Sequence, residues 1–260
     1  LNTEPLPVPE TLCATLRDYQ HQGYEWLVKN ARIGFGSLIA DDMGLGKTIQ
    51  IISLLLSLKE KGQLEDVPAL VVLPTTLLTN WSRELAQFAP DLRVHIYHGA
   101  ERKMPIQDID VILTTYGLVR RDGSAFASKK WAALILDEAQ NIKNHGTAQT
   151  KAVKKLKSGL RIAMTGTPVE NRLMDYWSIF DFLNKGYLKG IKAFNTDYAK
   201  PIEVERDHDR LAIFQKITSP FVLRRLKSDK SIIRDLPDKV ELDQFCDLTK
   251  EQTALYQSTM

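Results

Sequence analysis

Short apolar segments alternate with amphipathic segments as far as Pro168, and this alternation constrains the fold more than any other feature of the sequence. The segments 69–73 and 132–136 are apolar along their whole length. Strands of this kind are typical of a parallel sheet whose two faces are both covered by helices. The sequence therefore predicts an α/β fold. The expected strands are 37–41, 69–73, 93–97, 110–114, 132–136 and 161–164, and the helices between them include 77–88 and 147–157.

The alternation stops after Pro168. The segment 175–184 predicts an aromatic-rich helix, and 186–234 predicts helices and loops without a clear strand. A further segment, 236–246, alternates apolar and polar residues and predicts a strand or an extended linker. We therefore expect a helical appendage of roughly 60 residues on the α/β unit, which is within the usual range of domain sizes.

The composition excludes several classes of protein. Hydrophobic residues make up 43% of the 260 residues and charged residues 26%, as in ordinary globular proteins and unlike disordered chains. Cys13 and Cys246 are too few for a disulfide scaffold, and no apolar run approaches the roughly 18 residues of a membrane span. We expect an intracellular protein with no disulfide partner and no membrane. Because the chain begins at Leu1 and ends soon after an expected helix start at Thr249, we also expect it to be part of a longer protein.

The basic residues are clustered, although the net charge is only +3. The segment 143–161 holds six basic residues and no acidic one, and 216–234 holds six basic residues against one acidic residue, Asp229. Such clusters can neutralise nucleic-acid phosphates. Either cluster alone is more often a solvated helix face, so charge leaves both interpretations open.

A glycine-rich turn that ends in Gly-Lys-Thr follows the first expected strand and opens the next helix. A phosphate-binding loop requires this context, because main-chain N–H groups and the helix dipole both favour an anion there. Lys47 would reach the β- and γ-phosphates, and Thr48 would ligate Mg²⁺. A strict loop has glycine where Asp41 stands, so this loop is a variant; an ordinary strand-to-helix turn is the alternative. The expected nucleotide-binding residues are Gln20, Asp42, Met43, Gly44, Leu45, Gly46, Lys47 and Thr48.

Polar motifs also stand at the ends of two later strands. A strand-end aspartate such as Asp137 supplies a second ligand to Mg²⁺ in P-loop ATPases, and the adjacent Glu138 can polarise the attacking water as a general base. Thr165 opens Thr-Gly-Thr-Pro at another strand end. Because parallel strands end at one edge of a sheet, we expect these motifs to meet the glycine-rich loop. The amide of Gln20 offers a donor and an acceptor, which suits the edge of adenine.

Together these residues resemble the first RecA-like lobe of the SWI/SNF-type (Snf family) ATPases of helicase superfamily two. The resemblance rests on 41–48 (Asp-Asp-Met-Gly-Leu-Gly-Lys-Thr), 137–140 (Asp-Glu-Ala-Gln), 165–168 (Thr-Gly-Thr-Pro) and 220–225 (Pro-Phe-Val-Leu-Arg-Arg), and it covers nearly the whole chain. It implies a three-layer RecA-like (P-loop NTPase) parallel sheet flanked by helices, with a helical protrusion near the C-terminus. It further implies ATP and Mg²⁺ as cofactors and double-stranded DNA as a partner. The implied units are the lobe 1–171, the protrusion 172–235, and a linker 236–260 toward a second RecA-like lobe.

The resemblance also implies roles for single residues. Lys47, Asp137 and Glu138 would be catalytic, with Thr48 and Asp137 at the metal. Gln20 would read adenine. Thr165 and Thr167 would couple the nucleotide site to DNA, and the Arg224–Arg225 pair would lie near the connection to the second lobe. The other candidates for coupling or DNA contact are Gln140, Pro74, Thr75, Thr114, Thr115, Tyr116, Lys227 and Lys230.

Two departures bear on activity. Many family members have histidine where this chain has Gln140, whose amide can still hydrogen-bond to Thr165 or to the other lobe. Only residues 237–260 follow Leu236, too few for the second lobe that would supply arginine fingers. We therefore expect this chain alone to bind nucleotide weakly and to show little or no DNA-stimulated hydrolysis.

Two alternative functions stay open. An RNA helicase lobe would share the nucleotide motifs, and stimulation of ATP hydrolysis by RNA rather than duplex DNA would distinguish it. A non-hydrolysing nucleic-acid-binding module would have no need of Lys47, Thr48, Asp137 and Glu138, which are all present.

Overall fold

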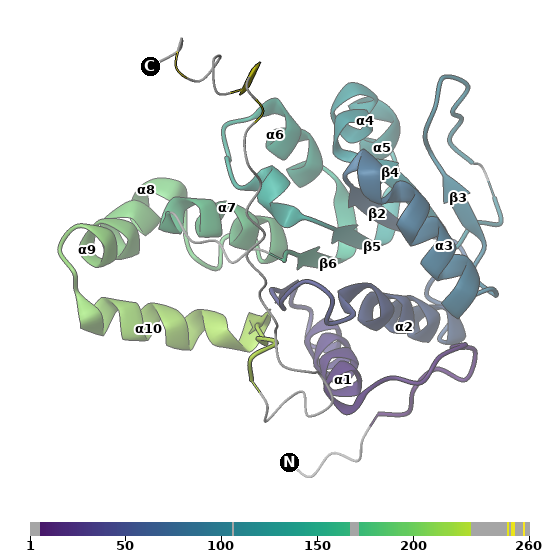
Figure 1. The fold of residues 1–260 in the computed structure, drawn as a ribbon, viewed down its shortest axis with the longest axis horizontal. Helices are drawn as coiled ribbons and strands as arrows, with labels where there is room; N and C mark the ends of the chain where they lie inside the picture. The colour runs from purple at the N-terminus through teal and green to yellow at the C-terminus, as the bar shows by residue number, and fades with distance from the viewer. Residues whose placement is uncertain are drawn as a thin grey trace.

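A seven-stranded parallel sheet lies at the centre of the computed structural model, which describes residues 6–105, 107–166, 172–229, 249, 251, 252 and 257. The strand order is β3-β4-β2-β5-β6-β1-β7 (Figure 1), and every paired neighbour runs parallel. The predicted parallel α/β fold is therefore confirmed, and all strands end at one edge. The strands are β1 (Ser37–Ile39), β2 (Ala69–Leu73), β3 (Val94–Ile96), β4 (Val111–Thr115), β5 (Lys130–Leu136), β6 (Lys157–Met164) and β7 (Val222–Leu223).

Helices cover both faces of the sheet because its central strands are buried on both sides. Along β2, Val71 faces one apolar core and Val72 faces the other, as the two-residue period of a strand requires. The first core packs α1 (Asp18–Arg32), α2 (Lys47–Glu60) and α3 (Leu78–Phe88) on the sheet. The second packs α4 (Tyr116–Arg121), α5 (Gly123–Ala127), α6 (Ala148–Lys154) and α7 (Leu173–Leu183), which Figure 1 shows on the opposite side.

The helical protrusion follows α7 and extends away from the sheet in Figure 1. Its own core consists mainly of aromatic side chains, among them Phe194 and Phe214, which pack against Trp177 and Phe180 of α7. Ile179 and Phe182 of the same helix face the sheet, so α7 belongs to both cores. The remaining elements are α8 (Ile191–Phe194), η3 (Asn195–Ala199), α9 (Lys200–Glu203), α10 (His208–Thr218) and η4 (Ser219–Phe221).

Two predictions about single segments need correction, and a third concerns a segment outside the described residues. The expected helix 147–157 is too long, because residues from Lys157 onward pair with β5 and extend β6 backward from the expected 161–164. The expectation of no strand in 186–234 is wrong, because Val222 and Leu223 form β7 beside β1. Two residues are too few to show a periodic pattern. The segment 236–246 and the proposed boundaries at 171 and 235 lie outside the described residues.

No helix in the described part of the chain combines the length and the apolar character needed to cross a membrane.

Candidate nucleotide-binding site

The glycine-rich loop connects β1 to the N-terminus of α2, as the sequence predicts. Gly44 and Gly46 have φ angles of 81° and 74°, in the left-handed region that glycine adopts without steric cost. Leu45 between them is fully buried against Tyr19 of α1, which anchors the loop. The first turn of α2 begins at Lys47, so its free N–H groups and the positive end of its dipole face the loop.

Lys47 points back into the loop. Its Nζ donates hydrogen bonds to the main-chain oxygens of Asp41 at 2.7 Å and Asp42 at 3.1 Å. Burial lowers the pKa of Lys47, and the negative charges of nearby carboxylates, with Asp41 the strongest, oppose that shift. A Cβ placed on Gly166 would lie 3.7 Å from Nζ, so the end of β6 meets the loop at this amine.

Asp137 follows β5 and is held on both carboxylate oxygens. Trp81 of α3 donates from Nε1 to Oδ2 at 2.8 Å, and the main-chain N–H of Glu138 donates to Oδ1 at 2.8 Å. Burial raises the pKa of Asp137, and these two hydrogen bonds counteract it. The Tyr116 hydroxyl donates to the main-chain oxygen of Asp137 at 2.7 Å. Trp81 thus fixes the carboxylate and Tyr116 fixes the main chain of Asp137, and the sequence indicated neither of these hydrogen bonds.

Glu138, Gln140 and Thr165 form a chain of hydrogen bonds between the ends of β5 and β6. Glu138 has a φ of 50°, an uncommon backbone conformation for a residue other than glycine. Nε2 of Gln140 donates to Oε2 of Glu138 at 2.7 Å, and the Thr165 hydroxyl donates to Oε1 of Gln140 at 2.9 Å. The expected hydrogen bond between Gln140 and Thr165 is therefore present.

Gln20 lies against the loop from the side of α1. Its Nε2 is 3.4 Å from the main-chain oxygen of Leu45, and a Cβ on Gly46 would approach Nε2 to 2.3 Å. The Gln20 side-chain oxygen accepts from the main-chain N–H of Arg17 at 3.0 Å, which orients the amide. Gln20 is thus brought together with the loop although 20 and more residues separate them in sequence.

The donor set suits a magnesium nucleotide. No group of three His, Cys, Asp or Glu in the described residues could hold a metal ion by itself. Mg²⁺ in nucleotide sites is usually held by one or two protein oxygens together with phosphate oxygens and water. Thr48 at the start of α2 and Asp137 at the end of β5 are the protein groups that could hold it.

The candidates for DNA contact are more dispersed. Thr114 is fully buried, with its hydroxyl donating to the main-chain oxygen of Tyr97 at 3.2 Å, and Tyr116 is buried at Asp137. The side chains of these two candidates are therefore interior and do not face a ligand at the surface. Pro74 and the exposed Thr75 begin η1 (Thr75–Leu77) at the end of β2. Thr167 and Lys230 lie outside the described residues.

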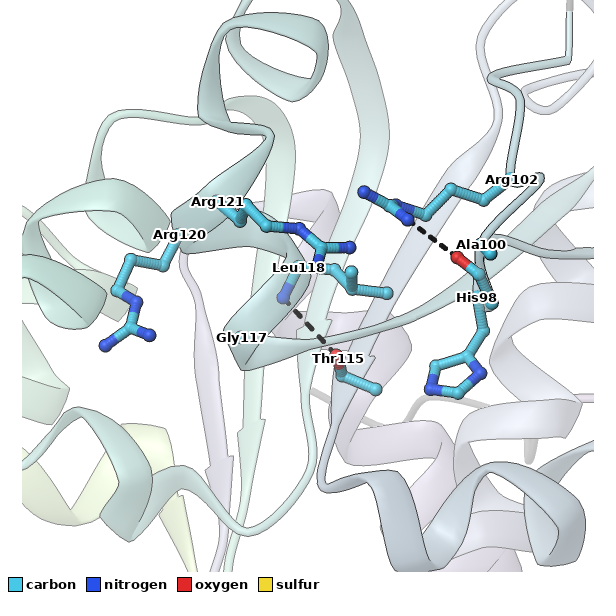
Figure 2. Close-up of a pocket in the computed structure, with 9 residues that line it drawn as sticks. His98, Ala100, Arg102, Thr115, Gly117, Leu118, Arg120 and Arg121 are labelled. Atoms are coloured by element: carbon cyan, nitrogen blue, oxygen red, sulfur yellow. Dashed lines mark hydrogen bonds between the residues drawn. The ribbon is translucent and has the colours of Figure 1, made fainter.

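A basic pocket of about 640 Å³ lies at the ends of β3 and β4 (Figure 2). Thr115 borders it and caps α4 by accepting from the main-chain N–H of Leu118 at 3.3 Å. Arg102 lies across the pocket from Arg121 in Figure 2, and both pair with Asp122. Arg120 is exposed and adds a third arginine to the two that share Asp122, so the positive charge exceeds the negative charge here. The lining residues are His98, Gly99, Ala100, Arg102, Thr115, Gly117, Leu118, Arg120 and Arg121.

Lys227 and Arg225 lie beside the glycine-rich loop rather than at this pocket. The main-chain N–H of Lys227 donates to Oδ2 of Asp42 at 2.9 Å, and its Nζ would be 3.0 Å from a Cβ on Gly44. Arg225 is buried with 5% of its surface exposed and pairs with the fully buried Asp41. Sequence reasoning missed this pair, because the aspartate in place of the loop's first glycine marks the loop as a variant but does not indicate its partner.

The chain is similar in sequence to several known proteins. The family described as the SNF2-related domain matches residues 19–260. YwqA of Bacillus subtilis, named provisionally as an ATP-dependent helicase/translocase, is 47% identical over 249 residues, which cover 94% of this chain and 27% of that protein. The chromatin-remodeling ATPase INO80 of Candida albicans is 36% identical over 273 residues, which cover 97% of this chain and 20% of that protein.

The fold of the chain is also similar to that of a solved structure. The Sulfolobus solfataricus SWI2/SNF2 ATPase core in complex with double-stranded DNA is 45% identical, with a TM-score of 0.85, and the match covers 98% of this chain and 54% of that one. The chain thus spans about half of that core and about a quarter of the Bacillus relative.

Proposed function

Because this chain belongs to the SNF2-related family and has the RecA-like fold of its ATPase core, we propose that it is the ATP-binding lobe of a translocase on double-stranded DNA. The observation that carries the proposal is the meeting of Lys47, Asp137 and Thr165 at the ends of β1, β5 and β6. Lys47 opens α2 after the loop that follows β1, whereas Asp137 and Thr165 directly follow β5 and β6, and the parallel sheet brings all three to the same edge.

Lys47 would exchange its main-chain partners for nucleotide phosphate. The oxygens of Asp41 and Asp42 now accept from its Nζ, and a phosphate between the loop and α2 would offer it stronger, charged acceptors. The N–H groups of the first turn of α2 and the left-handed Gly44 and Gly46 would surround the same phosphate. Gln20, which lies against the loop, would contact the base.

Asp137 and Thr48 would hold Mg²⁺, which neutralises phosphate charge during transfer. Asp137 needs to be ionised for this role. The hydrogen bonds from Trp81 and from the Glu138 main chain favour the carboxylate and partly offset its burial. Glu138 stands next to Asp137 with its carboxylate held by Gln140, a position from which it could accept a proton from water.

The hydrogen-bonded chain from Glu138 through Gln140 to Thr165 would couple the nucleotide to DNA. It ties the general-base candidate at the end of β5 to the Thr-Gly-Thr-Pro segment at the end of β6. A change at either end has to be accommodated by the amide between them, because it makes both bonds. We include Thr167 and Lys230 in the proposal on sequence grounds alone.

The basic pocket at the end of β4 would hold DNA backbone phosphates. It lies at the same edge of the sheet as the nucleotide loop, since both follow the ends of parallel strands. Arg120 and Arg121 supply charge, and Thr115 and Gly117 supply small polar and main-chain surface. Support comes from the Sulfolobus core, which was solved with double-stranded DNA. Pro74, Thr75 and Lys227 are further proposed contacts.

A second RecA-like lobe would complete the enzyme by closing on the nucleotide with arginine fingers. The chain spans 54% of the Sulfolobus core, so we propose that it needs this second lobe for hydrolysis and is weakly active or inactive alone. Thr48, Asp137 and Glu138 contribute ligands and a base but no arginine, and Arg225 is engaged by Asp41.

The experiment that tests the function compares ATP hydrolysis by a polypeptide carrying both lobes in the presence of duplex DNA, single-stranded DNA and RNA. The proposal predicts the strongest stimulation by duplex DNA and its loss in Lys47→Ala. Stimulation by RNA alone would identify an RNA helicase lobe instead. Binding of nucleic acid without hydrolysis under any of these conditions would identify a binding module.

A further inference from the structure

Arg225 contacts the glycine-rich loop 41–48, hereafter the phosphate loop, from the protein interior. It follows β7, far from the loop in sequence, yet its guanidinium is buried between α1, α2 and the end of β1. Its Nε lies 3.1 Å from both carboxylate oxygens of Asp41, and one terminal nitrogen also pairs with that carboxylate. The edge of the guanidinium that carries Nε and this terminal nitrogen therefore meets both carboxylate oxygens, the two-bond geometry in which such pairs are strongest.

The other donors of Arg225 are also used. One terminal nitrogen donates to the main-chain oxygen of Tyr19, and the other donates to Oε1 of Gln50 at 2.8 Å. The guanidinium lies 5.2 Å from the centre of the Tyr19 ring. Nε2 of Gln50 donates to the main-chain oxygen of Gly46 at 3.0 Å. The network thus runs from Arg225 to two points of the phosphate loop, Asp41 and Gly46.

The main chain on either side of Arg225 also hydrogen-bonds to the start of the loop. The N–H of Ala40 donates to the oxygen of Leu223 at 2.7 Å, and the N–H of Asp42 donates to the oxygen of Arg225 at 3.0 Å. The N–H of Arg225 donates to Oδ1 of Asp41 at 3.0 Å. The pairing of β7 with β1 therefore continues into the loop, and the segment 223–227 fixes the entry to the nucleotide site.

Charge explains why the arrangement concerns the nucleotide and not only the fold. Asp41 is fully buried at the start of a loop that would receive anionic phosphates, so an unpaired carboxylate there would repel the ligand. Lys47 interacts with this charge without a direct ion pair, since Nζ binds the main-chain oxygen of Asp41 and not the carboxylate. Arg225 is the cation in contact with that carboxylate among the described residues.

Gly23 fits the same interpretation. A Cβ at this position would lie 1.9 Å from Oε1 of Gln50 and 3.0 Å from a terminal nitrogen of Arg225. Its φ is not in the left-handed region, so the backbone does not require glycine here. The space around Gly23 is what favours glycine. A Cβ there would force the Gln50 side chain to shift, and that shift would disturb the contact between Gln50 and Arg225.

We propose that Arg225 is a positioning residue for nucleotide binding, which orients and neutralises Asp41 so that the variant phosphate loop can accept an anion. The proposal rests on the proposed function of this loop. It makes the segment after β7 part of the nucleotide site, although no atom of Arg225 has to touch the nucleotide.

The test measures binding of a fluorescent ADP with Mg²⁺, by anisotropy, to this chain and to four variants. Arg225→Gln leaves Asp41 buried without its partner and should raise Kd at least about tenfold. Arg225→Lys keeps the charge but not the planar fork and should fall between the two. Asp41→Asn with Arg225→Gln removes both charges and should recover most of the affinity. Arg224→Gln changes the exposed neighbour and should leave Kd within about twofold of the native value.

Thermal unfolding of the same samples separates positioning from folding. A merely structural role would lower the unfolding temperature of Arg225→Gln and leave the Kd of its folded fraction unchanged, which would overturn the proposal. If Arg225→Gln does not fold, Arg225→Lys and the double variant decide: native affinity in Arg225→Lys, or a Kd of the double variant that stays about tenfold or more above the native value, overturns it equally. Failure of the proposed function would look different, since the native chain and Lys47→Ala would then bind alike.

Discussion

The hydroxyl of Thr165 donates a hydrogen bond to the side-chain oxygen of Gln140 at 2.9 Å, while the nitrogen of that amide donates to Glu138 at 2.7 Å. One neutral side chain therefore joins the ends of β5 and β6. Histidine, which many family members have here, would also offer two polar atoms, but one of them can be charged near neutral pH. Gln140 makes the same connection without titrating.

Breaking this connection should affect hydrolysis more than binding. In the two-lobed protein, Gln140→Ala leaves Glu138 without its amide donor and should lower DNA-stimulated kcat by roughly ten- to a hundredfold, with little change in nucleotide Kd. Gln149→Ala, which removes a solvent-exposed amide bonded to the main-chain oxygen of Asn141, is the matched control. Equal losses of kcat and affinity in Gln140→Ala would contradict the coupling role.

Asp137→Asn should abolish hydrolysis and stabilise the fold at neutral pH. Burial raises the pKa of Asp137, so the folded state favours the protonated carboxyl, and ionisation at neutral pH costs stability. The gain from Asn should be present at pH 7 and shrink as the pH falls toward the unfolded pKa of about 3.9. Urea unfolding of both proteins between pH 4 and pH 8 measures it. A lower stability of Asp137→Asn at pH 7 would show that the bond from Trp81 outweighs burial.

Asp110 should contribute to the stability of the fold at neutral pH with the opposite sign to Asp137. Burial alone would raise its pKa, but hydrogen bonds from Arg93 and Lys59 outweigh burial and lower the pKa to about 2. Because the folded pKa is below the unfolded value of about 3.9, the contribution is present above pH 4 and is lost as the pH falls toward 2. Asp110→Asn should therefore cost about 2 kcal/mol at pH 7.

The control for Asp110 is its neighbour Asp108, whose side chain is 85% exposed and which pairs with the same arginine. Asp108→Asn should change the free energy of unfolding by no more than about 0.5 kcal/mol, since exposed ion pairs contribute little. Denaturant melts at pH 7 and pH 3 distinguish the two aspartates. Equal effects of the two substitutions would show that the buried pair does not carry this stability.

The basic pocket should contribute to the salt dependence of DNA binding. Replacing Arg120 and Arg121 together by Gln should lower the slope of log K against log salt by up to about 1.8 if each contacts one phosphate. The exposed Lys151 of α6 and Lys155 at its C-terminal cap serve as the control pair, because a solvated surface should leave the slope unchanged. A change confined to the control pair would move the DNA surface from the end of β4 to α6. The sequence also predicts that neutralising Lys227, Lys230 and Arg234 together lowers this slope, and the same measurement tests it: an unchanged slope would refute it.

The central sheet could be predicted from sequence because its strands are apolar along their length. Segment 69–73 corresponds to β2 residue for residue, since Pro74 ends it and both faces are buried. The start of β6 could not be predicted, because Lys157 and Ser158 are polar and become strand only through pairing with Lys130 and Trp131. Long-range pairing of this kind leaves no local pattern.

Some residues of the candidate nucleotide site could likewise be predicted from the sequence, and others could not. Lys47, Thr48 and Asp137 lie in contiguous motifs whose chemistry is readable from a few residues. Trp81 lies in the predicted helix 77–88, and its hydrogen bond to Asp137 could not be predicted because it depends on how α3 packs on the sheet. Arg225 reaches Asp41 across 184 positions of sequence, so neither residue indicates the other until β7 is placed beside β1.

Binding of a fluorescent ATP analogue to this chain, with and without Mg²⁺ and in the native and Lys47→Ala forms, tests nucleotide binding at the glycine-rich loop most directly. We expect weak, saturable binding that requires Mg²⁺, is displaced by unlabelled ATP and is lost in Lys47→Ala, while both forms unfold at similar temperatures. Equal affinity of the two forms would contradict a nucleotide site at Lys47.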